Sequence, residues 1–188
     1  MQSTPPDSSS VGLPLPCAAS TVVSAEQTGL EAEIVSLFDQ LRNPLLRYVL
    51  SIGLRVQDAE EIVQEVFLSL FCHVQIGRSR RNLRGWVFRV AHNLALKQRE
   101  RSRRDCEAGT GRTHDPAPDP EEQAVHSQRR RRLLAVLRAL PEQDQYCLRL
   151  RAEGLRYREI GEVLDMSLGA VSISLARSLA RLQRAAGG

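Results

Sequence analysis

The segment from Glu153 to Arg177 constrains the fold more than any other part of the chain, because its pattern predicts two short helices separated by a tight turn. The first helix is expected from about Tyr157 to Leu164. Within it, Ile160, Val163 and Leu164 recur at the spacing of a helix that buries one face in a core.

The residues around the turn fit this interpretation. Asp165 lies where the chain must reverse, and Asp tolerates the left-handed backbone conformation better than most other non-glycine residues. Gly161 keeps the first helix thin where another crosses it, and Ser167 is a good N-cap for the second helix. The second helix carries an apolar stripe of Leu168, Val171, Leu175 and Leu182. The pattern is that of a helix-turn-helix, whose second helix lies in the DNA major groove; the alternative is an ordinary helical hairpin in an all-α bundle.

Charge alternates along the chain in blocks. Residues 78–104 contain ten Lys or Arg and one Glu, a net charge of +9, whereas residues 31–77 carry −4 and residues 105–128 carry −5. Like charges at this density repel one another unless a polyanion or an acidic partner neutralises them, so nucleic acid is the simplest partner. Every basic residue except Lys97 is arginine, which suits bidentate contacts to phosphate and guanine. Genomic base composition explains the arginine bias equally well.

Three further segments show helical periodicity before the helix-turn-helix domain. A first helix is expected from about Leu30 to Ile52, with Pro44 kinking or interrupting it. A second is expected to start at Asp58, a plausible N-cap with Glu61 three residues on, and a third runs from about Leu83 to Arg103.

The sequence therefore predicts an all-α fold of two small helical domains joined by a flexible acidic linker. Residues 1–27, rich in Ser, Pro and Thr, are expected to form a disordered tail. The first domain is expected at residues 28–104, the linker at 105–121, and the helix-turn-helix domain at 122–185. Two helices, at about residues 122–139 and 142–152, are expected to precede the helix-turn-helix.

The sequence offers no candidate for catalysis or for a cofactor. The four cysteines lack the paired spacing of a zinc site or a disulfide framework, which suggests a reducing compartment. The four histidines are scattered, and no nucleophile triad or phosphate-binding glycine loop is present. No stretch is long and apolar enough to cross a membrane. We therefore expect a cytoplasmic, non-enzymatic protein without a metal or membrane insertion.

Three motifs then narrow the expectation further. The first reads DAEEIVQEVFLSLF at residues 58–71, and the second reads LRGWVFRVAHNLAL at residues 83–96. The third combines LPE at 140–142 with EGLRYREI at 153–160 and GAV at 169–171. In content and order these motifs resemble bacterial RNA polymerase sigma factors of the extracytoplasmic-function class. The resemblance covers about residues 30–185 and implies a chain with the two domains that read the −10 and −35 promoter elements.

The resemblance implies a role for each helix of the first domain. The second helix would dock on the paired clamp helices of the polymerase β′ subunit through an acidic and amide-bearing ridge of Asp58, Glu61, Gln64 and Glu65. The third helix would face the −10 element, where strand opening exposes single-stranded bases. Asn93 would hydrogen-bond a base edge there, with phosphate contacts from Arg84, Arg89, Lys97, Arg99 and Arg101. The loop before this helix lacks the aromatic residue that is usual in the family.

The recognition helix departs furthest from the family. Residues 170–175 read AVSISL where family members commonly have TVKSRL, so Ser172 and Ser174 replace two basic residues. This loss predicts weaker and less salt-dependent DNA binding. The residues expected to face bases are Ala170, Ser172, Ile173 and Ser174, and those expected to grip the DNA backbone are Arg156, Arg158, Arg177 and Arg181.

The partners implied are core RNA polymerase, through its β′ clamp helices and β subunit, and promoter DNA, with an anti-sigma factor left open. The implied function is promoter-specific initiation without catalysis. Two alternatives remain: a stand-alone helix-turn-helix regulator, which leaves the acidic helix and the +9 block unexplained, and a degenerate sigma-like adaptor that binds polymerase but no longer reads DNA.

Overall fold

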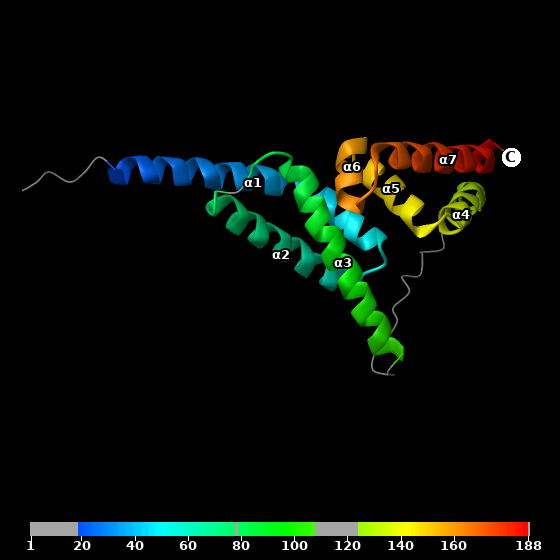
Figure 1. The fold of residues 1–188 in the computed structure, drawn as a ribbon. Helices are drawn as coiled ribbons and strands as arrows, with labels where there is room; N and C mark the ends of the chain where they lie inside the picture. Colours follow the sequence, from blue (N-terminus) through cyan, green and yellow to red (C-terminus); the bar gives the residue numbers. More distant parts are fainter. Residues whose placement is uncertain (1–18, 78, 108–123, 188) are drawn as a thin grey trace, which may run out of the picture.

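A computed structural model describes residues 19–77, 79–107 and 124–187, and these form α-helices with no strand (Figure 1). The all-α prediction is confirmed. The helices are α1 (Ala19–Ser51), α2 (Val56–Gln75), α3 (Leu83–Glu107), α4 (Ala124–Arg138), α5 (Glu142–Ala152), α6 (Tyr157–Leu164) and α7 (Leu168–Gly187). Most of the predicted linker lies outside the described residues, and its first three positions belong to α3.

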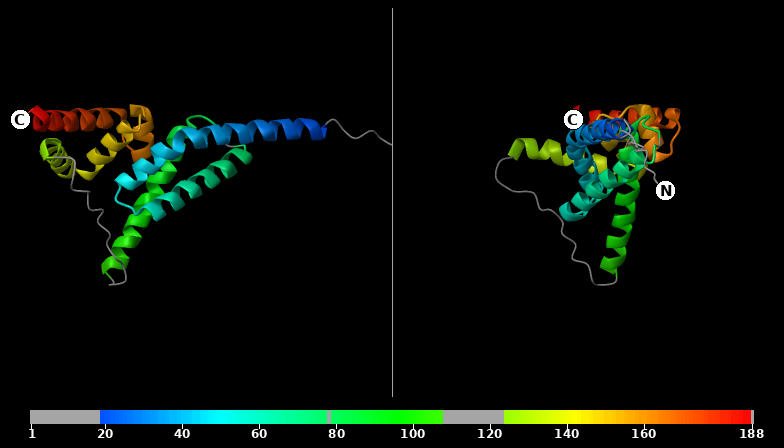
Figure 2. Two further views of the ribbon diagram at one scale, coloured as in Figure 1. Left: turned by 180° about the vertical axis from the view of Figure 1, so that it is seen from behind. Right: turned by 90° about the vertical axis from the view of Figure 1, so that its left-hand side faces the viewer.

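Helix α1 begins at Ala19, well before the start expected near Leu30, so residues 19–27 are helical and not part of an irregular tail. No proline follows Pro16 in this stretch, and extending an existing helix costs much less than nucleating a new one. Pro44 lies inside α1 and does not end it. The helix bends along its course in Figure 2, as expected where a proline removes a backbone hydrogen bond.

The prediction that α2 starts at Asp58 as its N-cap is wrong. The N-cap is Arg55 and the helix begins at Val56, so Asp58 already lies in the first turn. Its carboxylate accepts a hydrogen bond from Gln98 Nε2 of α3 at 3.3 Å. Asp58 therefore ties α2 to α3, while its negative charge still suits the positive end of the helix dipole.

The helix-turn-helix forms as predicted. Asp165 adopts the left-handed conformation with φ of 54°, and Ser167 Oγ accepts a hydrogen bond from the backbone N–H of Ala170 at 3.2 Å. A Cβ on Gly161 would lie only 2.7 Å from the carbonyl oxygen of Met166. A glycine is therefore required where the chain turns back over α6.

The two groups of helices pack directly on one another. The first unit comprises α1, α2 and α3, and the second unit comprises α4 to α7. Helix α3 contacts α6, and α1 contacts α5, while the C-terminal end of α3 projects beyond the rest of the molecule (Figures 1 and 2). One continuous apolar core includes Tyr48 and Phe88 of the first unit and Leu150 and Leu155 of the second.

We predict that Gly161→Ala destabilises the helix-turn-helix by about 1–3 kcal/mol, the usual cost of overpacking, because the new methyl group meets the Met166 carbonyl. Thermal unfolding followed by circular dichroism measures this loss. Gly169→Ala is the matched control, because nothing lies within 4 Å of its Cβ. Alanine should stabilise α7 there by up to about 1 kcal/mol. Equal effects of the two substitutions would contradict the packing argument.

Candidate functional site

Four of the predicted −10 residues form one exposed stripe on α3. Arg89, Asn93, Lys97 and Arg101 are spaced four residues apart, and all four side chains are exposed. Residues at this spacing lie along one face of a helix. The stripe therefore presents three cations and one amide to solvent, as a polyanion with exposed bases would require.

The other two predicted −10 residues contact the second unit instead. Arg84 is half-buried and donates from Nη2 to the backbone carbonyl of Glu153 at 2.6 Å. Arg99 is also half-buried and pairs with Glu142 of α5 at 2.7 Å. In this arrangement neither guanidinium belongs to the exposed stripe.

The predicted acidic ridge on α2 is largely exposed. Glu61, Gln64 and Glu65 face solvent, whereas Asp58 is half-buried against α3. Leu68 is 68% exposed and follows Gln64 by one turn. The ridge thus combines carboxylates, an amide and an apolar contact. Sequence reasoning missed Leu68. Its signal is an apolar residue that lies off the buried face of α2, which carries Ala59, Ile62, Val63, Val66, Phe67 and Leu70.

On the recognition helix α7, the structure separates the two serines that replace the family's basic residues. Ser172 is exposed and Ile173 is 67% exposed, while Ala170 is half-buried. Ser174 is only 3% exposed, and its Oγ donates to Asp144 Oδ1 at 2.7 Å. Successive residues on a helix are rotated by about 100°, so Ser174 points into the core although its neighbour Ile173 is exposed. The prediction that Ser174 faces DNA bases therefore does not fit this structure.

The four arginines expected to grip the DNA backbone are all exposed. Arg156 precedes α6, where its backbone N–H donates to Glu159 Oε2 at 2.6 Å, and Arg158 lies in the first turn. Arg177 differs from the others, since it pairs with the buried carboxylate of Asp144 at 2.6 Å.

Between α4 and α7 there is an apolar groove of about 450 Å³, lined by Leu133, Leu134, Leu137, Leu179 and Leu182 among others.

Polar contacts fasten the two units together. Arg47 of α1 binds Glu153 through two hydrogen bonds, Nη2 to Oε2 at 2.6 Å and Nε to Oε1 at 3.2 Å. Asn82, just before α3, donates to Glu162 of α6 at 2.6 Å. These contacts supplement the two made by Arg84 and Arg99. We call this set of contacts the junction.

A buried aromatic cluster lies at the centre of the junction. His92 of α3 is 6% exposed, and its Nδ1 lies 2.7 Å from the hydroxyl of Tyr48 of α1. The rings of His92 and Tyr146 of α5 meet edge to face at 4.9 Å between centroids. Burial, reinforced by the positive charge of Arg99, lowers the pKa of His92 to about 4. Burial also raises the pKa of Tyr48, so its hydroxyl stays protonated and donates a hydrogen bond to Nδ1 of the neutral imidazole.

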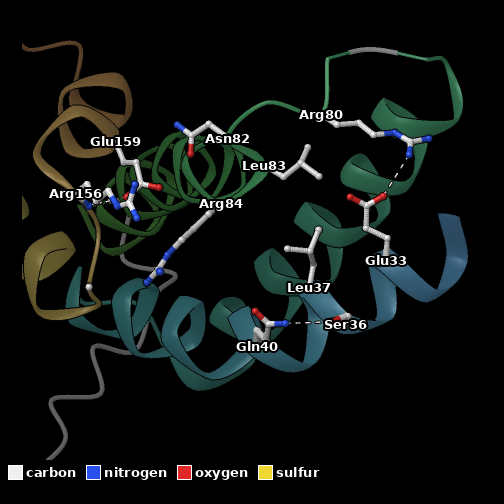
Figure 3. A pocket seen from close by; sticks show the side chains of 11 residues that line it. Glu33, Ser36, Leu37, Gln40, Arg80, Asn82, Leu83, Arg84, Arg156 and Glu159 are labelled. Carbon is white, nitrogen blue, oxygen red and sulfur yellow. Dashed lines mark hydrogen bonds and ion pairs between the residues drawn. The ribbon is translucent and has the colours of Figure 1, made fainter. Parts of the chain in front are cut away.

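Residues from both predicted DNA-reading parts line one pocket of about 600 Å³ beside the junction. Figure 3 shows Arg84 and Arg156 facing this pocket together, with α1 forming the opposite wall. Arg80, from the loop before α3, pairs with Glu33 of α1 at 3.3 Å. The two units are therefore in contact with one another beside this pocket.

The described part of the chain lacks both a cluster of metal ligands and a single membrane-spanning helix. No group of three or more His, Cys, Asp or Glu side chains lies close enough to hold a metal ion among these residues. No single described helix is long and apolar enough to cross a membrane. Only α6 and α7 taken together reach that length and apolar content among the described helices, and they are bent by 105° relative to one another.

Family comparisons agree with this geometry. The Sigma-70 region 2 model matches residues 37–105, which contain the acidic ridge and the basic stripe. The Sigma-70 region 4 model matches residues 130–182, which contain the helix-turn-helix. Together the two matches span well over half of the chain. The chain belongs to the sigma-70 family, in its extracytoplasmic-function class.

Among curated relatives, the sigma factor SigE of Mycolicibacterium smegmatis is 34% identical over 131 residues, which is 67% of this chain and 51% of SigE. BldN of Streptomyces coelicolor is 27% identical over 87% of this chain and 64% of its own length. The probable sigma factor RfaY of Xanthomonas campestris is 27% identical over 76% of this chain and 37% of RfaY. The chain thus spans between about a third and two thirds of the length of these relatives.

Two solved structures share the fold. The sigma factor RpoE in complex with the anti-sigma factor NepR from Bartonella quintana has a TM-score of 0.59 and 19% identity, with 80% of this chain and 93% of that chain covered. CnrH in complex with the cytosolic domain of CnrY has a TM-score of 0.58 and 18% identity, with 87% and 94% covered.

We predict that stability falls as the pH drops from 6.5 towards 4. The unfolded chain binds a proton at His92 near the ordinary pKa of 6.5, whereas the folded chain resists it until about 4, so acid favours unfolding in this window. His92→Gln keeps an acceptor for Tyr48 and does not titrate, so its unfolding midpoint should change less between pH 6.5 and 4.5. Parallel pH profiles for the two proteins would contradict this assignment.

Proposed function

We propose that this chain binds core RNA polymerase and directs promoter-specific initiation by reading the −10 and −35 elements. The observation that carries the proposal is the presence of both sigma-70 regions, in family order, each with an exposed surface of suitable chemistry. The proposed activity is binding, for which no catalytic group is needed. The proposed location is the cytoplasm, where core polymerase acts.

The proposed polymerase contact is the acidic ridge of α2. Its exposed members Glu61, Gln64 and Glu65 would pair with basic residues of the β′ clamp helices, and Leu68 would add apolar contact. The groove between α4 and α7 offers the second unit an apolar contact with the β subunit. Asp58 accepts a hydrogen bond from Gln98 of α3, so its proposed role is to position the ridge and not to contact polymerase itself.

The proposed −10 surface is the stripe of Arg89, Asn93, Lys97 and Arg101 on α3. Asn93 lies between two cations, so its amide can bond a base edge while the flanking charges hold phosphates. The proposed −35 surface comprises α7 and the start of α6, with Arg156 and Arg158 on the backbone. The proposed domain limits are 28–104 and 122–185.

The closed arrangement seen here cannot be the promoter-bound one. Elements named for positions −10 and −35 lie about 25 base pairs apart, which is roughly 85 Å of duplex at about 3.4 Å per base pair. Arg84, on the helix that carries the proposed −10 stripe, and Arg156, of the proposed −35 surface, line the same pocket. The proposed function therefore requires the junction to open when polymerase and DNA are bound.

Other partners and functions are distinguished by the same experiments. Two structural neighbours were solved with anti-sigma factor NepR and with CnrY, so a protein partner that holds this chain closed fits the proposal. A stand-alone regulator would bind duplex DNA without core polymerase. An adaptor would bind core polymerase and yield no promoter-specific transcripts in run-off transcription with genomic fragments.

We predict that Glu61→Arg weakens binding to core polymerase about tenfold or more, because a like charge then faces the basic clamp helices. Affinity measured with labelled chain and purified core enzyme tests this. Asp39→Arg is the control, since it makes the same charge reversal at an exposed position on α1. Failure of the unmodified chain to bind core polymerase would reject the proposed function itself.

We predict that Arg47→Glu or Glu153→Arg opens the junction, because each places like charges where two hydrogen bonds stood. Small-angle X-ray scattering should show a larger radius of gyration for each variant. The double variant Arg47→Glu/Glu153→Arg restores opposite charges and should regain the compact form; if it stays as extended as the single variants, the ion pair does not hold the units together.

A further inference from the structure

We infer that Arg177 reads a base pair of the −35 element and that the buried carboxylate of Asp144 positions it for this task. The inference rests on the proposed function and changes the role expected for Arg177, which the sequence assigns to the DNA backbone. It also gives Asp144 a role in DNA recognition, although Asp144 lies on α5 and outside the helix-turn-helix.

The contacts of Asp144 are all directed at α7. Asp144 is 3% exposed, and its Oδ2 accepts hydrogen bonds from Arg177 Nη2 at 2.6 Å and Nε at 3.2 Å. Its Oδ1 accepts a bond from Ser174 Oγ at 2.7 Å. Both carboxylate oxygens are thus occupied by donors one helical turn apart. The two bonds from Arg177 converge on one oxygen, so they hold the guanidinium by its Nε edge and restrict its orientation.

The remaining donors of Arg177 are left for a ligand. The side-on contact uses Nε and one hydrogen of Nη2, which leaves both hydrogens of Nη1 and the second one of Nη2. The Arg177 side chain is 50% exposed, so part of it still faces solvent. A guanidinium whose orientation is already restricted loses little entropy when it bonds to a base edge.

Charge argues for a base and against a phosphate as that ligand. The carboxylate of Asp144 cancels most of the positive charge of Arg177, so the pair gains little from the release of counterions, which dominates phosphate contacts. Hydrogen bonds to the O6 and N7 atoms of guanine depend on orientation more than on net charge, and arginine is the commonest residue to make them.

The surroundings of Arg177 on α7 fit a reader of bases. No charged residue occurs from Leu168 to Ala176, so Arg177 is the first one in the helix. One turn before it, Ile173 is 67% exposed and Ser172 is also exposed. Short uncharged side chains allow the helix to approach the base edges closely. Ser174 then acts as a second donor that keeps Asp144 in place, and is no longer a missing DNA contact.

The competing interpretation is that the ion pair only fastens α7 to α5. The two interpretations differ in how discrimination between base pairs responds to substitution. A loss of fastening weakens binding to all DNA sequences alike. A loss of positioning removes discrimination at one base pair and leaves the others unchanged.

The test uses holoenzyme reconstituted from core polymerase and the full chain, on a promoter found by run-off transcription. Affinities are measured for that fragment and for a set with single base-pair changes across the −35 element. Arg177→Ala should lose about tenfold of discrimination at one G·C pair, the usual share of one bidentate contact. Asp144→Asn, which keeps a partner for Ser174, should lose discrimination at the same pair. Its affinity for unrelated DNA should be unchanged or higher, because a negative charge is removed.

The double variant provides the decisive comparison. If Asp144 acts through Arg177, adding Asp144→Asn to Arg177→Ala has no further effect on discrimination. Arg177→Lys is measured beside them, because lysine keeps the charge but cannot make the forked contact, and it should lose the same discrimination without unfolding.

Additive effects, or an equal loss on every fragment, would overturn the positioning role of Asp144. If the unmodified holoenzyme discriminates and Arg177→Ala discriminates equally well, the base-reading role of Arg177 is overturned while the proposed function stands. If the unmodified chain binds core polymerase but selects no promoter, the proposed function itself fails, and this inference fails with it.

Discussion

The packing of α3 against α6 is the interaction on which the rest of this structure depends. It brings Asn82 to Glu162 at 2.6 Å and the Arg84 guanidinium to the carbonyl of Glu153 at 2.6 Å. It also helps to enclose His92 of α3 between Tyr48 of α1 and Tyr146 of α5. An imidazole in this position stays neutral, because burial and the positive charge of Arg99 lower its pKa more than the charge of Glu142 raises it. Because α3 packs against α6, the apolar core is also continuous across the two units.

This packing has a direct consequence for the proposed function. The faces of the two units that meet at the junction carry Arg84 and Arg156, whereas the stripe centred on Asn93 and the ridge centred on Gln64 remain exposed. The closed chain can therefore present the ridge proposed to bind polymerase before the two units separate. Polar contacts at the junction are partly exposed, with the Arg47 side chain at 61%, so they favour closure without making it permanent.

The sequence was sufficient for elements whose pattern is local. Periodicity located α5 and α6, Ser167 and Asp165 defined the turn, and three motifs identified the family and the helices that carry its surfaces. It was insufficient where burial depends on distant neighbours. Asp58 was expected to cap α2 but lies in its first turn against Gln98, and Ser174 was expected to face DNA but is bound to Asp144. Leu68 was detectable as an apolar residue off the buried face of α2, whereas Asp144 gave no local signal.

The sequence alone determined the class of fold, the order of the helices, the family and the faces of α2 and α3 that are exposed, because helical periodicity and short motifs are properties of neighbouring residues. Only the tertiary structure decided which arginines are committed to internal partners. Arg99 and Arg177 find those partners on α5, and Arg47 and Arg84 find theirs at Glu153 just after α5, up to 106 residues away in the chain. Such pairings are set by how the units pack, and no spacing in the sequence encodes them.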